Sequence, residues 1–471
     1  MSRGFLGDLE DAGQRAVDGL AQLATRLYGG ELRLGVTGLR RAGKTVFVTS
    51  LLDNLLKAGR LPFLDAMAQG RYVAARLRPQ PDPAVPRFDY EGFLATLTGP
   101  DPVWPKPTSA VSEIRIDLRF RPGGLVRQRL GGIANLTLDI VDYPGEWLLD
   151  LPLLDQEFAH WSRATLELSA AGPRRDLSRP WREALDAVDP GADADEATAR
   201  RLAELYTDYL KACRSNAVGL SLLQPGRFLE PGEMAGAPVL TFCPLPAGPT
   251  AGRRSLHALM ADRFEAYKDK VVRRFFREHF ARIDRQIVLV DVLSALNAGA
   301  PGLDDLERSL AMTLDSFVFG RPGVMSWLGG ARIDRVLFAA TKADHIAASQ
   351  HVNLKTLLES FLAAPLNAVR FSGARVEAMA LAAVKSTETV LTDYQGQPLA
   401  CVQGVPVGRD APTVIFPGEV PANRGEVPAG AEGRFDFTNF RPPKGLGADG
   451  RGLPNVRLDQ ALQFLIGDRL A

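Results

Sequence analysis

The segment GLRRAGKT at residues 38–45 constrains the fold of this 471-residue chain more than any other feature of the sequence. It lies between a short apolar run at 32–36 and a stretch at 46–56 whose apolar residues recur with helical spacing. It fits the pattern G-x-x-x-x-G-K-[ST], which is typical of a loop that joins a strand to a helix and wraps backbone N–H groups around a polyphosphate. The sequence therefore predicts a nucleotide-binding P-loop. A glycine-rich turn with an incidental Lys-Thr pair is the alternative, which the flanking strand and helix patterns disfavour.

Each polar residue of this segment has an expected role. Gly38 and Gly43 permit the tight turn, Lys44 is expected to reach the β and γ phosphates, and Thr45 is expected to bind Mg²⁺ through its hydroxyl. The N-terminus of the following helix favours the same negative charge. The P-loop residues expected to contact the nucleotide are Gly38, Arg41, Ala42, Gly43, Lys44, Thr45 and Val46.

A second motif, Asp-x-x-Gly, follows the predicted strand at 133–141. Asp142 lies at the carboxyl end of that strand, where open α/β sheets bind ligands, and is expected to hold Mg²⁺. Gly145 offers a backbone N–H that can approach a γ-phosphate without interference from a side chain. Asp291 ends another apolar run, but no Pro-Gly follows it, so Asp142 is the preferred metal ligand.

A third motif, Thr-Lys-x-Asp at 341–344, ends an apolar run at 335–340 and indicates recognition of guanine. Asp344 is expected to accept hydrogen bonds from the guanine N1–H and 2-amino groups, a pair of donors that adenine lacks. The stem of Lys342 is expected to lie on the base while its ammonium reaches toward the P-loop, with Thr341 beside it. The end of the last predicted strand, at 376–384, is a weaker signal for contact with guanine O6. Its expected backbone contacts are Ala382, Ala383 and Val384.

The order of these three motifs resembles that of the P-loop GTPases. Longer stretches, at 104–115, 142–154, 229–232, 242–246 and 457–465, are similar to the bacterial YcjX-like family. Since these stretches span nearly the whole chain, the resemblance is not confined to the P-loop. It implies a G-domain enlarged by extra domains, guanine nucleotide and Mg²⁺ as ligands, and a stress-associated role in bacteria.

The expected fold class is α/β: a P-loop G-domain with a mostly parallel sheet and helices on both faces, an inserted α-helical domain and a small β-rich C-terminal insertion. Residues 62–107 are rich in proline and are expected to be largely irregular, and 255–283 reads as one long helix. The final helix, at 458–470, is expected to return to the sheet. The predicted parts are an N-terminal amphipathic helix (1–30), a first G-domain part (31–165), a helical insertion (166–235), a second G-domain part (236–390) and a β-rich region ending in a helix (391–471).

Composition limits the classes of partner and compartment. The chain has 56 basic and 55 acidic residues, which argues against a dedicated nucleic-acid binder. Its cysteines, Cys213, Cys243 and Cys401, have no metal-ligand spacing and favour a reducing compartment. No stretch of eighteen apolar residues and no apolar signal-peptide core are present, so we expect a cytoplasmic protein. The N-terminal helix and the basic positions of 255–283 leave peripheral contact with a membrane, a membrane protein or another protein effector open.

Two positions bear on hydrolysis. Many GTPases place a glutamine directly after Asp-x-x-Gly to orient the attacking water, whereas this chain has Glu146, whose carboxylate adds charge near an anionic γ-phosphate. Slow turnover is the expected consequence. Many small GTPases keep a glycine in the part of the P-loop where this chain has Arg40 and Arg41. A long side chain there either obstructs an activator's arginine finger or acts as one in cis, and the alternative is that both arginines point to solvent.

A switch residue is expected shortly before the strand at 111–120, where a threonine closes over Mg²⁺ and the γ-phosphate in GTPases. Thr108 is the preferred residue and Ser109 its competitor. The sequence thus favours a slow, Mg²⁺-dependent GTPase that acts as a nucleotide-dependent switch. It leaves open a nucleotide-sensing module with negligible hydrolysis and an ATP-using P-loop enzyme.

Overall fold

The computed structural model describes residues 30–39, 41–106, 110–123, 132–215, 219–246, 252–317, 333–369, 374–427 and 435–471. Three expectations lie outside these residues: the N-terminal helix, the role of Arg40, and the choice between Thr108 and Ser109.

A seven-stranded sheet with the order β2-β3-β4-β1-β5-β6-β7 forms the centre of the fold. Strands β4, β1, β5, β6 and β7 pair in parallel, in that order. At one edge, β3 pairs antiparallel with β4, and β2 pairs antiparallel with β3. All six residues of β5 are buried, as expected for a strand covered on both faces. The strands are β1 (Gly30–Gly38), β2 (Tyr72–Arg78), β3 (Ser112–Phe120), β4 (Ala134–Asp142), β5 (Arg285–Val290), β6 (Arg335–Ala340) and β7 (Arg375–Ala380).

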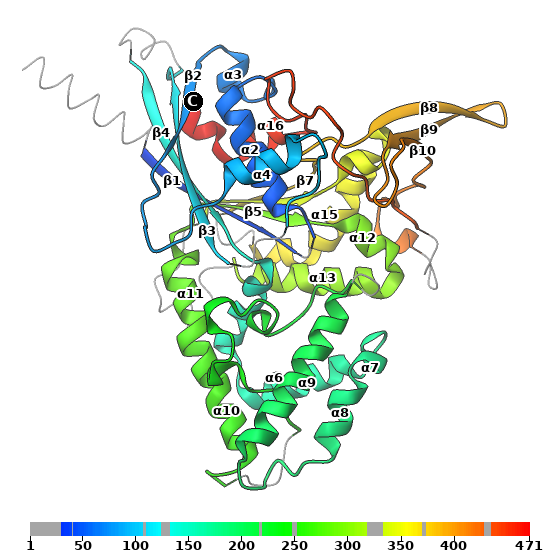
Figure 1. Ribbon diagram of the computed structural model, residues 1–471. Helices are drawn as coiled ribbons and strands as arrows, with labels where there is room; N and C mark the ends of the chain where they lie inside the picture. Colours follow the sequence, from blue (N-terminus) through cyan, green and yellow to red (C-terminus); the bar gives the residue numbers. More distant parts are fainter. Residues whose placement is uncertain are drawn as a thin grey trace, which may run out of the picture.

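Helices cover both faces of this sheet (Figure 1). One face carries α2 (Lys44–Lys57), α3 (Asp65–Ala68), α4 (Tyr90–Thr98) and α16 (Leu458–Ile466), and the other carries α12 (Val292–Asn297), α13 (Gly299–Asp315) and α15 (His351–Val369). Leu51 of α2 and Leu462 of α16 share an apolar cluster with Leu34 of β1. The final helix therefore packs on the sheet, as expected. The fold class predicted from the sequence is confirmed.

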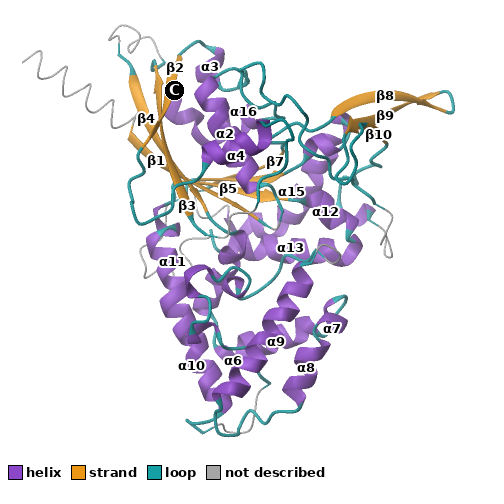
Figure 2. Ribbon diagram, viewed as in Figure 1, coloured by secondary structure: helices purple, strands orange, loops and turns teal. Residues whose placement is uncertain are grey.

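A helical lobe projects from the sheet on the side of α13 (Figure 2). Its aromatic core stacks Trp161 on Phe264 with ring centroids 5.0 Å apart, and sets Trp161 edge-on against Tyr206. These residues lie on three different helices, so the lobe extends on both sides of the predicted 166–235. Its helices are α6 (Phe158–Ser169), α7 (Arg174–Leu177), α8 (Arg179–Asp186), α9 (Glu196–Arg214), α10 (Leu256–Tyr267) and α11 (Arg273–Glu278).

The structure corrects two local expectations. The single helix predicted over 255–283 is interrupted by a π-helical turn at Lys268–Val272, which separates α10 from α11. The stretch 62–107 is not irregular, because it contains α3, β2 and α4. Its described prolines lie outside these three elements. Tyr72 of β2 anchors the edge strand by donating a hydrogen bond to the Leu55 carbonyl.

A small antiparallel sheet follows the central one in the chain. It corresponds to the β-rich C-terminal insertion that the sequence predicted. It consists of β8 (Glu388–Tyr394), β9 (Gln397–Gly404) and β10 (Thr413–Ile415), with β9 in the middle. None of the helices in the described part of the chain combines the length and the apolar content needed to cross a membrane.

A buried ion pair fastens the helical lobe to the sheet domain. The guanidinium of Arg174 on α7 lies 2.5 Å from the carboxylate of Asp305 on α13, and both side chains are about 5% exposed. The same carboxylate accepts hydrogen bonds from the amides of Ser221 and Leu222. The pair is therefore fully coordinated inside the protein.

We expect Asp305→Ala to lower the free energy of unfolding by about 3–5 kcal/mol, because it leaves a buried guanidinium without its counterion. The neighbouring Asp304→Ala is the matched control, since Asp304 is exposed and pairs with Arg424 at the surface. Its expected effect is below about 1 kcal/mol. Urea unfolding of both variants measures the difference. Equal losses in the two variants would contradict the anchoring role of Asp305.

Candidate nucleotide-binding site

The P-loop joins the end of β1 to the start of α2, as predicted. Arg41 and Gly43 both have positive φ, at 55° and 80°, so the backbone curls before the first turn of α2. At Gly38, an added Cβ would lie 3.0 Å from the Cβ of Leu289 and 3.1 Å from that of Ala42. Glycine at 38 is thus favoured by the close packing of the loop on β5, and glycine at 43 by its left-handed conformation. The result is the turn that a phosphate-binding loop needs.

The two polar side chains that follow occupy the first turn of α2. Thr45 is buried and Lys44 is half-buried, whereas Arg41 is exposed. None of the ion pairs recorded among the described residues uses Lys44. Val46 packs against an apolar cluster that includes Leu97, so only its backbone is available to a nucleotide.

The Asp-x-x-Gly motif lies directly against the P-loop. Asp142 is the last residue of β4, is buried, and is in register with Val36 of β1. A Cβ at Gly145 would clash with the carbonyl oxygen of Gly38, so the two backbones touch. A threonine hydroxyl from the first turn of α2 and a carboxylate from the end of β4 are a donor set of the kind that Mg²⁺ takes, together with phosphate oxygens and water. Thr45 and Asp142 fit this ion.

The competing aspartate is used elsewhere. Asp291 accepts hydrogen bonds from the amide and hydroxyl of Ser294, and thereby caps α12. Its carboxylate also pairs with the ammonium of Lys342 at 2.5 Å. These contacts give Asp291 a structural role and favour Asp142 as the metal ligand.

The predicted guanine motif is held by a serine that the sequence reading missed. Asp344 is buried at the end of β6, and its Oδ2 accepts hydrogen bonds from both the amide (2.7 Å) and the hydroxyl (2.6 Å) of Ser386. The hydroxyl of Thr387 donates to the Asp344 carbonyl. The carboxylate is therefore fixed in orientation, as base recognition requires. The only signal in the sequence was a Ser-Thr pair two residues beyond the predicted contact loop.

The loop after β7 lies beside this motif, since the Ala343 amide donates to the Leu381 carbonyl. The amide of Ala382 donates to Val456 at 3.1 Å, so it is not free to donate to guanine O6. The carbonyl of Ala383 accepts from Ser50 of α2. Val384 buries its side chain in the cluster that also contacts Val46. The loop is where the sequence placed it, but Ala382 is engaged by the protein itself.

Lys342 departs from its predicted orientation. Its ammonium lies 2.5 Å from Asp291 and 3.0 Å from the side-chain oxygen of Asn439, and does not extend to the P-loop. β5 and β6 are neighbours, so Asp291 and Lys342 meet at adjacent strand ends, where a buried carboxylate requires a cation. Thr341 donates its hydroxyl to the Val290 carbonyl and secures the same corner.

Glu146, the residue after Asp-x-x-Gly, is enclosed by the helical lobe. Its Oε1 lies 3.6 Å from the guanidinium of Arg214, the last residue of α9, which in turn lies 2.5 Å from Glu230. A Cβ at Gly226 would clash with the Glu146 carbonyl, so the lobe also contacts this backbone. No motif or spacing in the sequence indicated this contact.

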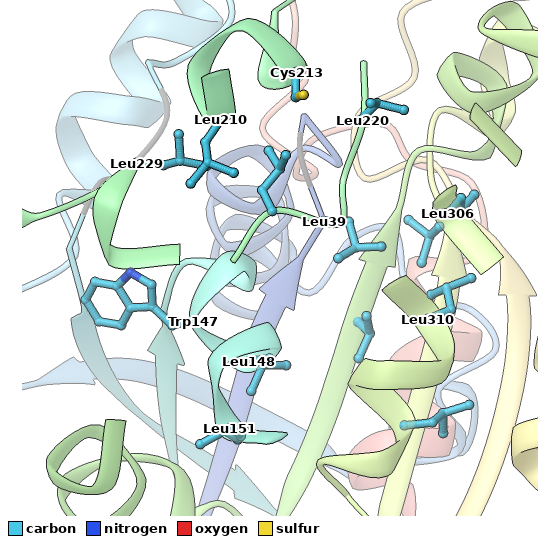
Figure 3. Close-up of a cluster of buried hydrophobic side chains, with 14 of the residues drawn as sticks. Leu39, Trp147, Leu148, Leu151, Leu210, Cys213, Leu220, Leu229, Leu306 and Leu310 are labelled. Carbon is cyan, nitrogen blue, oxygen red and sulfur yellow. The ribbon is translucent and has the colours of Figure 1, made fainter. Parts of the chain in front are cut away.

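The segment Gly145–Asp155 connects the P-loop to the lobe. Trp147 is packed between the guanidinium of Arg227, 3.3 Å from its ring centroid, and the edge of Phe275. Figure 3 shows Trp147 and Leu148 in the apolar cluster that also contains Leu39 of the P-loop. A change in the P-loop therefore has a direct packing route into the lobe.

The same segment carries a carboxyl group with an unusual acidity. Asp150 accepts hydrogen bonds from the Gly226 amide and the Tyr267 hydroxyl, and burial raises its pKa from 3.8 to about 7. Between these two values the folded state binds a proton that the unfolded state has lost. The contribution of Asp150 to stability is thus complete below pH 4 and is lost as the pH rises through 7.

We expect this contribution to fall by roughly 1.4 kcal/mol per pH unit between pH 5 and pH 6.5, and to be absent from Asp150→Asn. Urea unfolding gives the free energy of unfolding of both proteins across this pH range. The difference between their slopes against pH is the contribution of Asp150, because the two proteins share all other titrating groups. Parallel pH profiles for the two proteins would contradict the buried, protonated carboxyl.

The sheet order and the three loops at neighbouring strand ends define a protein of the P-loop GTPase-like class. The model of the YcjX-like family, DUF463, matches residues 32–470, and the chain belongs to this family. It is 40% identical over 468 residues to the "Ras-like GTPase YcjX" of Escherichia coli K12, covering 97% of this chain and all of that protein. It is 37% identical over 460 residues to the protein of the same name from Shewanella oneidensis MR-1, covering 93% and 94%. The similarity therefore includes the helical lobe and the small sheet.

Proposed function

We propose that this chain binds GTP and GDP, hydrolyses GTP slowly with Mg²⁺, and changes the contacts of its helical lobe with the state of the nucleotide. The observation that carries the proposal is the fixed carboxylate of Asp344, held by Ser386 at the sheet edge that also bears the P-loop. A carboxylate in this place accepts from two neighbouring donors of guanine and repels adenine, which offers no such pair.

The residues divide the work of phosphoryl transfer, which depends on positioning and charge neutralisation more than on a strong base. Backbone amides of Arg41 and of Gly43 to Val46 cradle the phosphates, whereas the Ala42 amide donates to the Leu39 carbonyl. Lys44 adds a positive charge at the outer end of the phosphates. Thr45 and Asp142 hold Mg²⁺, which offsets phosphate charge when bound. The Gly145 amide approaches the γ-phosphate. Arg40 and Thr108, outside the described residues, remain the proposed contributors to hydrolysis and to metal binding.

Slow turnover is part of the proposal. Glu146 replaces the glutamine that many GTPases use to orient water, and it is engaged with Arg214. The presence of a carboxylate in place of this glutamine also favours a second function, a nucleotide-sensing module that binds GTP without useful hydrolysis. A role in the bacterial stress response, a cytoplasmic location and a protein effector that reads the lobe complete the proposal, on the strength of the family.

Single-turnover phosphate release tests the proposal. Purified protein loaded with GTP is expected to release phosphate at a rate between about 10⁻⁴ and 10⁻² s⁻¹, the range of GTPases without an activator in trans, and to stop in EDTA. Tight binding of GTP with no release above the uncatalysed rate would support the sensing module. Equal release from ATP would contradict the guanine assignment and support an ATP-using enzyme.

A further inference from the structure

Glu146 presents an electrostatic difficulty at the proposed γ-phosphate position. It directly follows Gly145, whose backbone touches Gly38 of the P-loop, so Glu146 is one residue away from the proposed γ-phosphate contact. A carboxylate can accept a hydrogen bond from the attacking water, but an uncompensated one repels the phosphate. Its charge needs a partner from the protein.

Arg214 is that partner, and its position is fixed by packing. Leu210 and Cys213, on the last turn of α9, belong to the same apolar cluster as Leu39 of the P-loop (Figure 3). This packing brings the C-terminal end of α9 to the phosphate loop. The guanidinium of Arg214 then lies between two carboxylates, 3.6 Å from Glu146 and 2.5 Å from Glu230. Arg214 is 28% exposed and Glu146 10%, so water screens this pair only in part.

We propose that Arg214 is a positioning residue for GTP hydrolysis, supplied by the helical lobe, which neutralises Glu146 and directs its carboxylate toward the attacking water. This inference rests on the proposed function. In the reaction, the water oxygen bonds to the γ-phosphorus as the bond to the β–γ bridging oxygen breaks, and both water protons end on the inorganic phosphate. Glu146 accepts a hydrogen bond from the water and remains ionised throughout.

Glu230 sets the strength of this effect. The Glu230 carboxylate lies closer to the Arg214 guanidinium than the Glu146 carboxylate does, and so draws the guanidinium away from Glu146. Removing its charge shifts the guanidinium toward Glu146. The helical lobe can thus tune hydrolysis through the balance of two carboxylates around one arginine.

The first test is Arg214→Ala in the full chain, with single-turnover hydrolysis at saturating GTP and GTP affinity measured separately. We expect the rate to fall by about tenfold to a hundredfold, the loss caused by misplacing a reacting group by about 1 Å, with affinity changed less than about threefold. Lys211→Ala is the matched control, because Lys211 lies one turn earlier on α9 and pairs with Asp208 at the surface. An unchanged rate in Arg214→Ala would overturn the proposal.

A double-mutant cycle separates positioning from a general effect on the lobe. In the Glu146→Gln background the charge to be neutralised is gone, so adding Arg214→Ala is expected to cost less than about threefold. An equal loss in both backgrounds would overturn the proposal, since Arg214 would then act through something other than Glu146. Arg214→Lys keeps the charge and is expected to restore most of the rate should Arg214→Ala fold poorly.

Glu230→Gln supplies an independent measurement in the opposite direction. It is expected to raise the rate, because Arg214 then pairs with Glu146 alone, and a fall in rate at unchanged affinity would contradict the proposed balance. These outcomes are distinct from failure of the proposed function. If the wild-type chain binds no GTP, the function is wrong. If it binds and hydrolyses GTP and the variants behave like Lys211→Ala, only the role of Arg214 is wrong.

Discussion

Lys44→Ala is expected to weaken the binding of both GTP and GDP by at least a hundredfold. The lysine of the G-K-[ST] sequence directs its ammonium at the outer phosphates, and two charge-assisted hydrogen bonds of about 1.5–3 kcal/mol each correspond to a loss of about 3 kcal/mol or more. Lys44 lies in the first turn of α2 and enters none of the ion pairs recorded among the described residues, so its replacement should leave the fold intact. Isothermal titration with each nucleotide in Mg²⁺ measures the loss.

The control for this variant is Lys355→Ala. Lys355 lies on α15 and pairs with Glu359 on the exposed side of that helix. The Lys355→Ala substitution removes the same charge far from the phosphate loop. Its nucleotide affinity should stay within about twofold of wild type if surface charge alone has little influence. Retention of GTP and GDP affinity in Lys44→Ala, with both proteins folded, would remove the P-loop assignment.

Asp344→Asn is expected to change the preferred base from guanine to xanthine. Both donors of Ser386 point at Oδ2 of Asp344, so an asparagine must turn its carbonyl oxygen toward Ser386 and its NH₂ toward the base. That NH₂ can donate a hydrogen bond to the 2-carbonyl of xanthine. In guanine it meets the N1–H and 2-amino groups, which are also donors, so no hydrogen bond forms. Guanine affinity should fall at least about a hundredfold, as in sites whose buried polar group loses its partner.

Competition between GDP and xanthosine diphosphate measures this reversal. Asp393→Asn is a suitable control, because Asp393 lies at the exposed end of β8 and accepts a hydrogen bond from the Gly396 amide in the turn to β9. Unchanged preference for GDP in Asp344→Asn would show that Asp344 does not meet the base, whatever the P-loop binds.

The sequence predicted the parts of the fold whose signals are local. The P-loop has fixed spacing, the parallel strands are continuous apolar runs, and the final helix has a regular apolar face, so each is legible without its neighbours. β2 was missed because an edge strand needs little apolar content and stood among prolines. The attachment of α6 to the helical lobe has no local signal, because Trp161 stacks on Phe264, which lies far along the chain.

The predicted site shows the same division. Motif residues lie at the expected strand ends, because the carboxyl ends of parallel strands meet at one edge of a sheet. Ser386, Arg214 and the Asp291 contact of Lys342 were not predicted. Each depends on which side chains from distant segments meet in the folded protein, and no spacing in the sequence records such a meeting.

Titration of the wild-type protein with GDP, GTP and ATP in Mg²⁺ tests the central claim most directly. We expect binding of GDP and GTP, with ATP weaker by at least about a hundredfold because adenine gives Asp344 no pair of donors. Equal affinity for ATP and GTP would contradict a guanine-specific switch, and would leave a P-loop protein whose third motif has another purpose.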